Sequence, residues 1–139
     1  MSVLVDTSFL FALKNLDDEN HSRAVELYRE LFRGRHGVGY TTNLIFAEAV
    51  TVALARSNRH SAAVSMGELL LRADPSGPRF SLHHLTPAQL NAAWDECRRH
   101  RDKSLSMTDW TSIVVARDLE IAQILSFDAG FDGLYARLA

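Results

Sequence analysis

Apolar residues recur along this chain at two spacings, and together these spacings predict an α/β fold. Four short apolar runs suit buried strands, and the segments between them repeat their apolar residues every three or four positions, as a helix with one buried face does. Strands that alternate with helices predict a three-layer α/β/α sandwich with a central parallel sheet of four to five strands. The expected strands cover residues 3–5, 38–42, 80–85 and 121–127.

Between these strands the pattern predicts helices that begin at residues able to accept hydrogen bonds from free backbone N–H groups. The helices expected are a short one through residue 14, a second ended by the glycines at 34 and 37, and others over 44–55, 60–72, 87–97 and from 107. The expected caps are Thr7 or Ser8, Asp17 or Asp18, Thr42 or Asn43, and Thr86. Residues 74–78 contain two prolines and a glycine, which predicts a break after the fourth helix.

Residues 44–55 form the most apolar of the expected helices. They are apolar nearly all round, which is typical of a helix buried on every side. Glu48 is the only ionisable residue in this segment before Arg56. Because a buried carboxylate is costly unless it is paired or bound to a metal, Glu48 is a candidate functional residue rather than a solvated surface acid.

Three further acids stand where their side chains are expected to meet Glu48. Asp6 follows the first strand, Asp128 follows the fourth, and Asp109 lies in the first turn of the last long helix. The carboxyl ends of parallel strands share one edge of the sheet, where α/β proteins bind ligands. Each acid alone has an ordinary explanation, as a helix cap, a turn residue or a charge that favours the helix dipole. The coincidence of all four predicts one acidic pocket.

An acidic pocket of this kind has a restricted chemistry. Four carboxylates around one cleft raise one another's pKa unless a divalent cation neutralises them. The set contains only oxygen ligands, with no cysteine or histidine interleaved, which favours Mg²⁺ or Mn²⁺ over Zn²⁺. Cations held by carboxylates activate water and stabilise an in-line displacement at phosphorus, so the pattern indicates phosphoryl-transfer chemistry.

Length and composition limit the classes of protein that fit. The chain has 139 residues, 47% of them hydrophobic, which corresponds to a single domain, 1–139, with a real core. Its net charge of −2 gives no strong overall attraction to nucleic acid. The single cysteine, Cys97, excludes an intramolecular disulfide and fits the reducing cytoplasm. Asp6 interrupts the apolar N-terminal run, so neither a signal peptide nor a membrane span is expected.

The stretches that carry the four acids resemble the motifs of a known family. They are Val3-Leu4-Val5-Asp6-Thr7-Ser8, Thr42-Asn43-Leu44-Ile45-Phe46-Ala47-Glu48, Ser104-Leu105-Ser106-Met107-Thr108-Asp109 and Ile124-Leu125-Ser126-Phe127-Asp128-Ala129-Gly130-Phe131. Their order and spacing resemble the PIN-domain ribonucleases, and among them the VapC-type toxins of bacterial toxin–antitoxin pairs. The resemblance covers essentially the whole chain.

This resemblance implies an α/β/α sandwich and an endoribonuclease that depends on Mg²⁺ or Mn²⁺. It implies that the four acids, Asp6, Glu48, Asp109 and Asp128, are the catalytic, metal-binding quartet. It also implies that the neighbouring hydroxyls of Ser8 and Thr108 support them. An RNA substrate (tRNA or rRNA), a cognate antitoxin that occupies the cleft, and a homodimer follow from the resemblance alone.

The chain departs from the family pattern at three points. It ends soon after Asp128, so the last strand of the family is expected to be short or missing, with a tail that is mostly helical or irregular. Ser126 replaces a common threonine, and Trp110 replaces the small residue that often follows the third acid. None of these changes removes a predicted ligand.

Two groups of basic residues are candidates for contact with the RNA backbone. Arg98, Arg99, Arg101 and Lys103 precede the last long helix, and the arginines at 33 and 35 with the histidine at 36 form a smaller group. Cations are also ordinary at the solvated end of a helix, where they complement its dipole. Our hypothesis is that one of the two groups follows the RNA backbone.

Two other functions fit the same acids less well. A phosphotransferase with Asp6 as covalent nucleophile usually has a second acid soon after the first, and here Thr7, Ser8 and Phe9 follow. A catalytically silent RNA- or protein-binding module on this fold would not need all four acids. Metal binding at the cleft distinguishes this last alternative from a nuclease.

Overall fold

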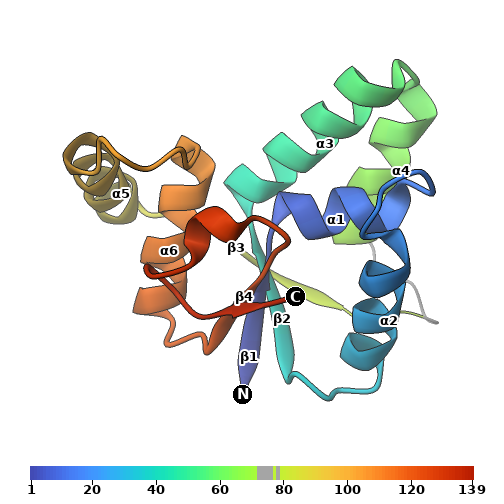
Figure 1. Cartoon of the computed structure of the whole chain (residues 1–139), viewed down its shortest axis with the longest axis horizontal. Coiled ribbons are helices and arrows are strands. Elements are labelled where there is room, and N and C mark those ends of the chain that lie inside the picture. The colour runs from blue at the N-terminus through green and yellow to red at the C-terminus, as the bar shows by residue number, and fades with distance from the viewer. Residues whose placement is uncertain (72–76, 78) are drawn as a thin grey trace.

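A computed structural model describes residues 1–71, 77 and 79–139 of the chain (Figure 1). Its centre is a five-stranded sheet in the order β3-β2-β1-β4-β5, with all neighbouring strands parallel. The strands are β1 (Ser2–Val5), β2 (Val38–Thr42), β3 (Phe80–His83), β4 (Gln123–Leu125) and β5 (Arg137–Leu138). The expected parallel sheet is confirmed.

The helices form two layers because the chain crosses the sheet in two directions. They are α1 (Thr7–Lys14), α2 (His21–Phe32), α3 (Asn43–Ser57), α4 (His60–Leu71), α5 (Pro87–Arg99) and α6 (Met107–Asp118). The first four carry the chain from β1 through β2 to β3, and α5 and α6 return it to β4 on the other side of β1. Right-handed crossovers then place α5 and α6 on the opposite face from α2 and α4, as Figure 1 shows. The direction changes between β1 and β4, a position at which α/β sheets bind ligands.

The central strand is packed on all sides. Val3, Leu4 and Val5 of β1 are at most 1% exposed, because β2 and β4 flank them and helices cover both faces. Trp110 of α6 and Phe9 of α1 are among the largest fully buried side chains. This packing fixes the end of β1, and with it the start of the acidic pocket.

Of the four expected caps, two are confirmed and two are wrong. Thr42 and Thr86 each accept a hydrogen bond from the backbone N–H three residues later, at the starts of α3 and α5. The cap expected at Thr7 or Ser8 is wrong, because both residues lie inside α1. Asp6 is the cap: it keeps an extended backbone, and its side chain accepts a hydrogen bond from the Ser8 N–H.

The cap expected at Asp17 or Asp18 is also wrong. The turn after α1 continues to Asn20, which precedes α2 without a side-chain capping bond. Asp18 instead accepts a hydrogen bond from the Asn20 N–H at 2.8 Å. The acid therefore stabilises the turn rather than the helix, because its side chain satisfies a nearer backbone donor.

The expectation that 44–55 is a fully buried helix is wrong. In α3 only Ile45, Ala49 and Ala53 are buried, and Leu54 is 45% exposed. Glu48 is half-buried. The helix packs one stripe against its neighbours α1, α4 and α6, and an apolar composition does not by itself provide further neighbours.

The helix that is buried nearly all round is α6, whose sequence is more polar. Its residues 109–116 are all buried, including hydroxyls and one carboxylate. The hydroxyls of Thr111 and Ser112 donate to the backbone carbonyl of Thr108, so their burial leaves no free donor. Tertiary position, not composition, made this helix the buried one.

The C-terminal tail adds a strand. After β4 comes a short 3₁₀ turn, η1 (Ala129–Phe131), and then β5, two residues long and parallel to β4. The tail was expected to be mostly helical or irregular with a short or missing last strand, and the 3₁₀ turn and the two-residue β5 confirm this expectation. Strands β3 and β4 are shorter than the ranges 80–85 and 121–127. Most of the predicted break at 74–78 lies outside the described residues. Among the helices that the structure describes, none is long and apolar enough to cross a membrane.

Candidate active site

The four predicted acids line one open cavity at the carboxyl edge of the sheet, which we call the acid cavity. Its volume is about 580 Å³. Asp6 follows β1, Glu48 projects from α3, Asp109 lies in the first turn of α6, and Asp128 follows β4. The other lining residues are Thr7, Ser8, Phe11, Asp18, Asn20, Val52, Arg56, Ser104, Ser106 and Phe127.

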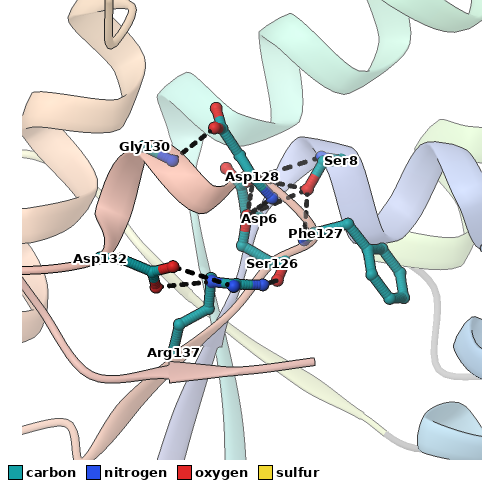
Figure 2. Close-up of polar contacts among 8 residues, drawn as sticks. All are labelled: Asp6, Ser8, Ser126, Phe127, Asp128, Gly130, Asp132 and Arg137. Carbon is teal, nitrogen blue, oxygen red and sulfur yellow. Dashed lines mark hydrogen bonds and ion pairs between the residues drawn. The ribbon is translucent and has the colours of Figure 1, made fainter. Parts of the chain in front are cut away.

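Asp6 is the most strongly bonded of the four acids (Figure 2). Its Oδ2 accepts hydrogen bonds from the Ser126 Oγ at 2.8 Å, the Ser8 Oγ at 2.9 Å and the Ser8 N–H at 3.3 Å. Its Oδ1 is buried and has no hydrogen-bond partner in the described part of the chain. Burial raises the pKa of Asp6, and the bonds from Ser126 and Ser8 oppose this shift. A buried oxygen without a donor is unfavourable, so Oδ1 is well placed to bind a cation.

Ser8 and Ser126 play matching parts in this network. Each hydroxyl donates to Asp6 and accepts a backbone N–H, that of Phe127 for Ser8 and that of Asp128 for Ser126, both at 3.0 Å. The network therefore joins the end of β1 to the loop after β4. The supporting position predicted for Ser8 fits this geometry. The sequence did not predict that Ser126 would bond to Asp6. The feature that could have indicated it is a hydroxyl two residues before Asp128.

The loop after β4 is also held from the C-terminal tail. Arg137 of β5 donates from Nη1 to the carbonyl oxygen of Ser126 at 3.2 Å. The same guanidinium forms two hydrogen bonds with the Asp132 carboxylate, at 2.9 and 3.1 Å, as Figure 2 shows. The short tail therefore fixes the residue that bonds to Asp6.

Asp109 reaches the cavity from a capping box at the start of α6. Its Oδ2 accepts the Ser106 N–H at 2.9 Å, and the Ser106 Oγ accepts the Asp109 N–H at 3.1 Å. Burial raises the pKa of Asp109 to about 7, and the neighbouring charges of Asp6 and Glu48 add to the effect. Asp109 is thus held rigidly in the very place where its negative charge is least favourable.

The other two acids lie nearer to solvent. Glu48 is half-buried and Asp128 is exposed. Asp128 Oδ1 accepts the Gly130 N–H at 2.8 Å, which holds its carboxylate over the turn (Figure 2). Across the described residues, no three His, Cys, Asp or Glu side chains form a group that could hold a metal ion as they stand. Closer approach of the carboxylates requires rotation of Glu48 and Asp128, which their exposure permits.

The chemistry of the cavity nevertheless fits a divalent cation. Among the described residues Asp6 Oδ1 has no donor, and neighbouring Asp109 has a pKa raised to about 7. A cation at this point would give Oδ1 a ligand and offset the repulsion among the carboxylates. Four carboxylates and the serine oxygens form an all-oxygen set, the kind that Mg²⁺ and Mn²⁺ prefer.

Thr108 does not take the supporting position predicted for it. The residues that line the acid cavity include Ser104 and Ser106 but not Thr108. The Thr108 carbonyl accepts hydrogen bonds from the hydroxyls of Thr111 and Ser112 one turn later. The Asp109 carboxylate is held instead by the backbone N–H of Ser106, because the capping box pairs the acid with the residue three positions before it.

The basic residues predicted to contact RNA do not line the acid cavity. Arg98 and Arg99 lie at the end of α5, where Arg98 pairs with the Asp95 carboxylate at 3.0 Å and Arg99 donates to the Asp95 carbonyl. Arg101 and Lys103 are exposed in the connection to α6. Their contact with RNA stays a prediction.

The second basic group lies at the edge of the sheet opposite the acid cavity. Arg33, Arg35 and His36 come between α2 and the start of β2, at the amino edge (Figure 1). His36 forms a 2.6 Å ion pair with Glu30. The cation that does line the acid cavity is Arg56, which sequence reasoning used only to mark the end of an apolar segment. The sequence feature that could have identified Arg56 was its position two helical turns after Glu48 on an otherwise apolar helix.

Comparison with known protein families matches residues 3–136 to the PIN domain. The match covers nearly the whole chain and includes all four acids. It therefore includes every element that builds the acid cavity.

Individual proteins of known sequence or structure are also similar. The 23S rRNA-specific endonuclease VapC20 of Mycobacterium tuberculosis is 31% identical over 129 residues, covering 93% of this chain and 91% of the relative. The crystal structure of VapC20, a "Sarcin-Ricin loop cleaving toxin", matches with a TM-score of 0.78 and 30% identity over 93% of this chain and 92% of its own. VapBC2 from Rickettsia felis, bound to promoter DNA, matches with a TM-score of 0.67 over 99% of this chain and 98% of its own, and at 12% identity it shows the fold alone.

Proposed function

This chain belongs to the PIN domain family and is a VapC-like RNA endonuclease, and from that premise we propose that its reaction depends on Mg²⁺ or Mn²⁺ bound in the acid cavity. The proposed ligands are Asp6, Glu48, Asp109 and Asp128. Divalent metal is general for nucleases of this family, and the choice between these two ions is part of the proposal.

One observation carries this proposal. Four carboxylates from four separate segments line one cavity, and at its floor a buried oxygen, Asp6 Oδ1, has no partner among the described residues. Beside it, the pKa of Asp109 is raised to about 7. A buried carboxylate oxygen without a donor and a second buried acid beside it are both unfavourable, and a bound cation would offset both effects.

Different residues of the chain would bind the cation and orient its ligands. A bound divalent cation would lower the pKa of a water molecule and stabilise negative charge on a phosphate. Asp6 and Asp109 supply oxygens fixed by the network and the capping box, and Glu48 and Asp128 supply oxygens at the mouth. The hydroxyls of Ser8 and Ser126 donate hydrogen bonds to Asp6, so they orient that carboxylate and do not act as nucleophiles.

We further propose that the substrate is ribosomal RNA. VapC20, which is named as specific for 23S rRNA, is 31% identical across 93% of this chain. Transfer RNA is the other substrate that the family resemblance implies. A cognate antitoxin, a homodimer and a cytoplasmic location are parts of the same proposal. Of these, only the antitoxin is supported by a similar structure, a toxin–antitoxin complex from Klebsiella pneumoniae with which this chain shares its fold.

The test is cleavage of RNA by protein purified free of antitoxin. Total tRNA and ribosomal RNA are incubated with the wild type in Mg²⁺, in Mn²⁺ and in chelator, with Asp6→Asn in parallel. We expect discrete cuts in ribosomal RNA that require metal and disappear in Asp6→Asn, because this variant removes a buried negative charge from the floor. Isothermal titration with Mn²⁺ measures binding at the cavity independently of cleavage.

Each result has a definite meaning. Cleavage that persists in chelator contradicts the metal proposal, and cuts confined to tRNA contradict the ribosomal substrate. Folded wild type that binds Mn²⁺ and RNA without cutting either class favours the silent binding module instead.

A further inference from the structure

We propose that a second cavity, beside the acid cavity, binds the RNA strand that flanks the cleaved bond, through Lys14, Arg56 and Arg59. We call it the basic hollow. Its volume is about 840 Å³, and it lies among α1, the turn after α1, α3 and α4. The inference rests on the proposed function, because it assigns a place to the substrate of that site.

The basic hollow and the acid cavity are continuous. Phe11, Asp18 and Arg56 line both of them. A strand whose phosphate lies over the acids can therefore extend into the hollow without leaving the protein surface. The volume of the hollow is in the range of pockets that enclose a small organic ligand, which suits a short piece of single strand.

Three cations line this space, and two of them are held there by uncharged partners. The Arg56 guanidinium lies 4.6 Å from the centre of the Phe11 ring, and the Lys14 ammonium donates to the Ser65 hydroxyl at 2.9 Å. Arg59 is exposed at the start of α4. Within the described part of the chain none of the three forms an ion pair, unlike the arginine at 98, so their charges are available to an anion.

Acids of the turn after α1 also line the hollow, and they give the strand an orientation. Asp17 and Asp18, in the turn after α1, line the hollow. These acids repel phosphates, so the phosphates follow the wall formed by α3 and α4. The bases then face the turn, where a carboxylate accepts hydrogen bonds from amino groups such as that of cytosine.

This lining favours a polyanion over an amphipathic peptide. Apart from the Phe11 ring, the apolar side chains that contribute are small or buried, as Ala53 and Met66 are. The remainder is cations, hydroxyls, an amide and two acids. A peptide helix that docks through an apolar face would find little matching surface, whereas phosphates would find three free cations.

The experiment measures RNA affinity in a background that does not cut. Arg59→Gln, Lys14→Gln and Arg56→Gln are each combined with Asp6→Asn, and Kd is measured by fluorescence anisotropy for labelled single-stranded RNAs of about 16 and about 4 nucleotides. Arg33→Gln, at the amino edge of the sheet, is the matched control. Arg59→Lys keeps the positive charge without the guanidinium, so it shows whether the charge alone maintains the affinity.

We expect each neutralising variant to weaken binding of the longer RNA about fivefold and to reduce its salt slope by about 0.7. The shorter RNA should bind Arg59→Gln as tightly as the wild type, because it does not reach that residue. Arg33→Gln should change neither RNA, and Arg59→Lys should keep most of the affinity. In the cleaving enzyme, Arg59→Gln should raise KM for the longer RNA and leave kcat unchanged.

Two outcomes overturn the inference. Either the three variants leave the affinity for the longer RNA unchanged, or Lys14→Gln and Arg59→Gln, whose residues line only the hollow, weaken short and long RNA equally. Unchanged RNA affinity together with weaker binding of the purified antitoxin would assign the hollow to that protein instead. The proposed function fails separately, since a wild type that shows these binding effects but cuts RNA in chelator, or cuts only tRNA, would contradict only the proposed metal or the proposed ribosomal substrate.

Discussion

The floor and the rim of the acid cavity carry the same kind of group in two different physical states. On the floor, Asp6 and Asp109 are 3% and 7% exposed, and burial raises the pKa of both. On the rim, Glu48 is half-buried and Asp128 is exposed. The floor acids are fixed by hydrogen bonds from Ser8, Ser126 and Ser106, whereas the bond to Asp128 comes from a turn in solvent.

This difference shows that position in the fold, not residue type, decides what each carboxylate contributes. The floor acids are held where their charge is unfavourable, so they gain the most from a bound cation. The rim acids lie nearer to solvent, so their charge is less unfavourable and they gain less from a bound cation. The following predictions test this division.

The largest effect is expected at the floor. Asp6→Asn should lower kcat/KM for RNA about a thousandfold or more, because it removes a charged carboxylate that lines the cavity and has a buried oxygen without a partner in the described part of the chain. Asn can still accept hydrogen bonds from Ser8 and Ser126, so the fold should persist, which circular dichroism checks. A loss smaller than that of a rim variant would contradict the division.

The rim should matter less. Glu48→Gln should lower kcat/KM by about tenfold to a hundredfold, with an effect that higher Mn²⁺ partly reverses, because the remaining acids still bind the cation. Asp128→Asn is the companion variant, and we expect a loss of similar size. Equal losses at Glu48 and Asp6, with no rescue by metal, would show that all four carboxylates act alike.

Substitution of Ser126, which positions Asp6, should lower kcat/KM about as much as substitution of a rim acid. Ser126→Ala removes a hydroxyl that donates to Asp6 and accepts the Asp128 N–H, so we expect kcat/KM to fall about tenfold to a hundredfold. Ser126→Thr keeps the hydroxyl and should retain most activity. Metal titration separates this from a purely structural defect, since Ser126→Ala should weaken Mn²⁺ binding while it leaves the circular dichroism spectrum unchanged.

The raised pKa of Asp109 predicts a pH-dependent stability. The folded protein binds the proton of Asp109 more tightly than the unfolded chain does, since the pKa rises from 3.8 to about 7. The stability contributed by this group is therefore present at acid pH and is lost as the pH rises through about 7. In chelator, Asp109→Asn should be more stable than the wild type at alkaline pH by on the order of 2 kcal/mol, and nearly equal in acid.

Urea unfolding in acid and in alkaline buffer measures this effect. Added Mg²⁺ should stabilise the wild type more than Asp109→Asn, because the variant has lost part of the site. A variant that is less stable than the wild type at alkaline pH in chelator would show that the charge of Asp109 is not unfavourable in the free protein.

The smallest effect is expected on the exposed face of α3. Leu54→Gln should change the free energy of unfolding by less than about 0.5 kcal/mol, because Leu54 is 45% exposed. Ile113→Ala on α6 should cost about 2–5 kcal/mol, because this side chain is completely buried. Similar costs at the two positions, measured by urea unfolding, would restore the original expectation of a buried α3.

The sequence by itself determined the parallel sheet, the order of its elements and the identity of the four acids. Val3 to Val5 are apolar on both faces, and the acid that follows marks the end of a buried strand. Strong local signals, such as the Thr42 and Thr86 caps, also held, because they depend on neighbours within one turn.

Only the tertiary structure decided which parts of this pattern are buried. It placed the apolar α3 with one side in solvent and the more polar α6 in the core, since burial depends on how many elements surround a helix. It brought Ser126 to Asp6 and Arg56 to the cavity across long stretches of chain. Spacing along a sequence carries no such distances, and for this reason the floor and the rim could be distinguished only in the folded chain.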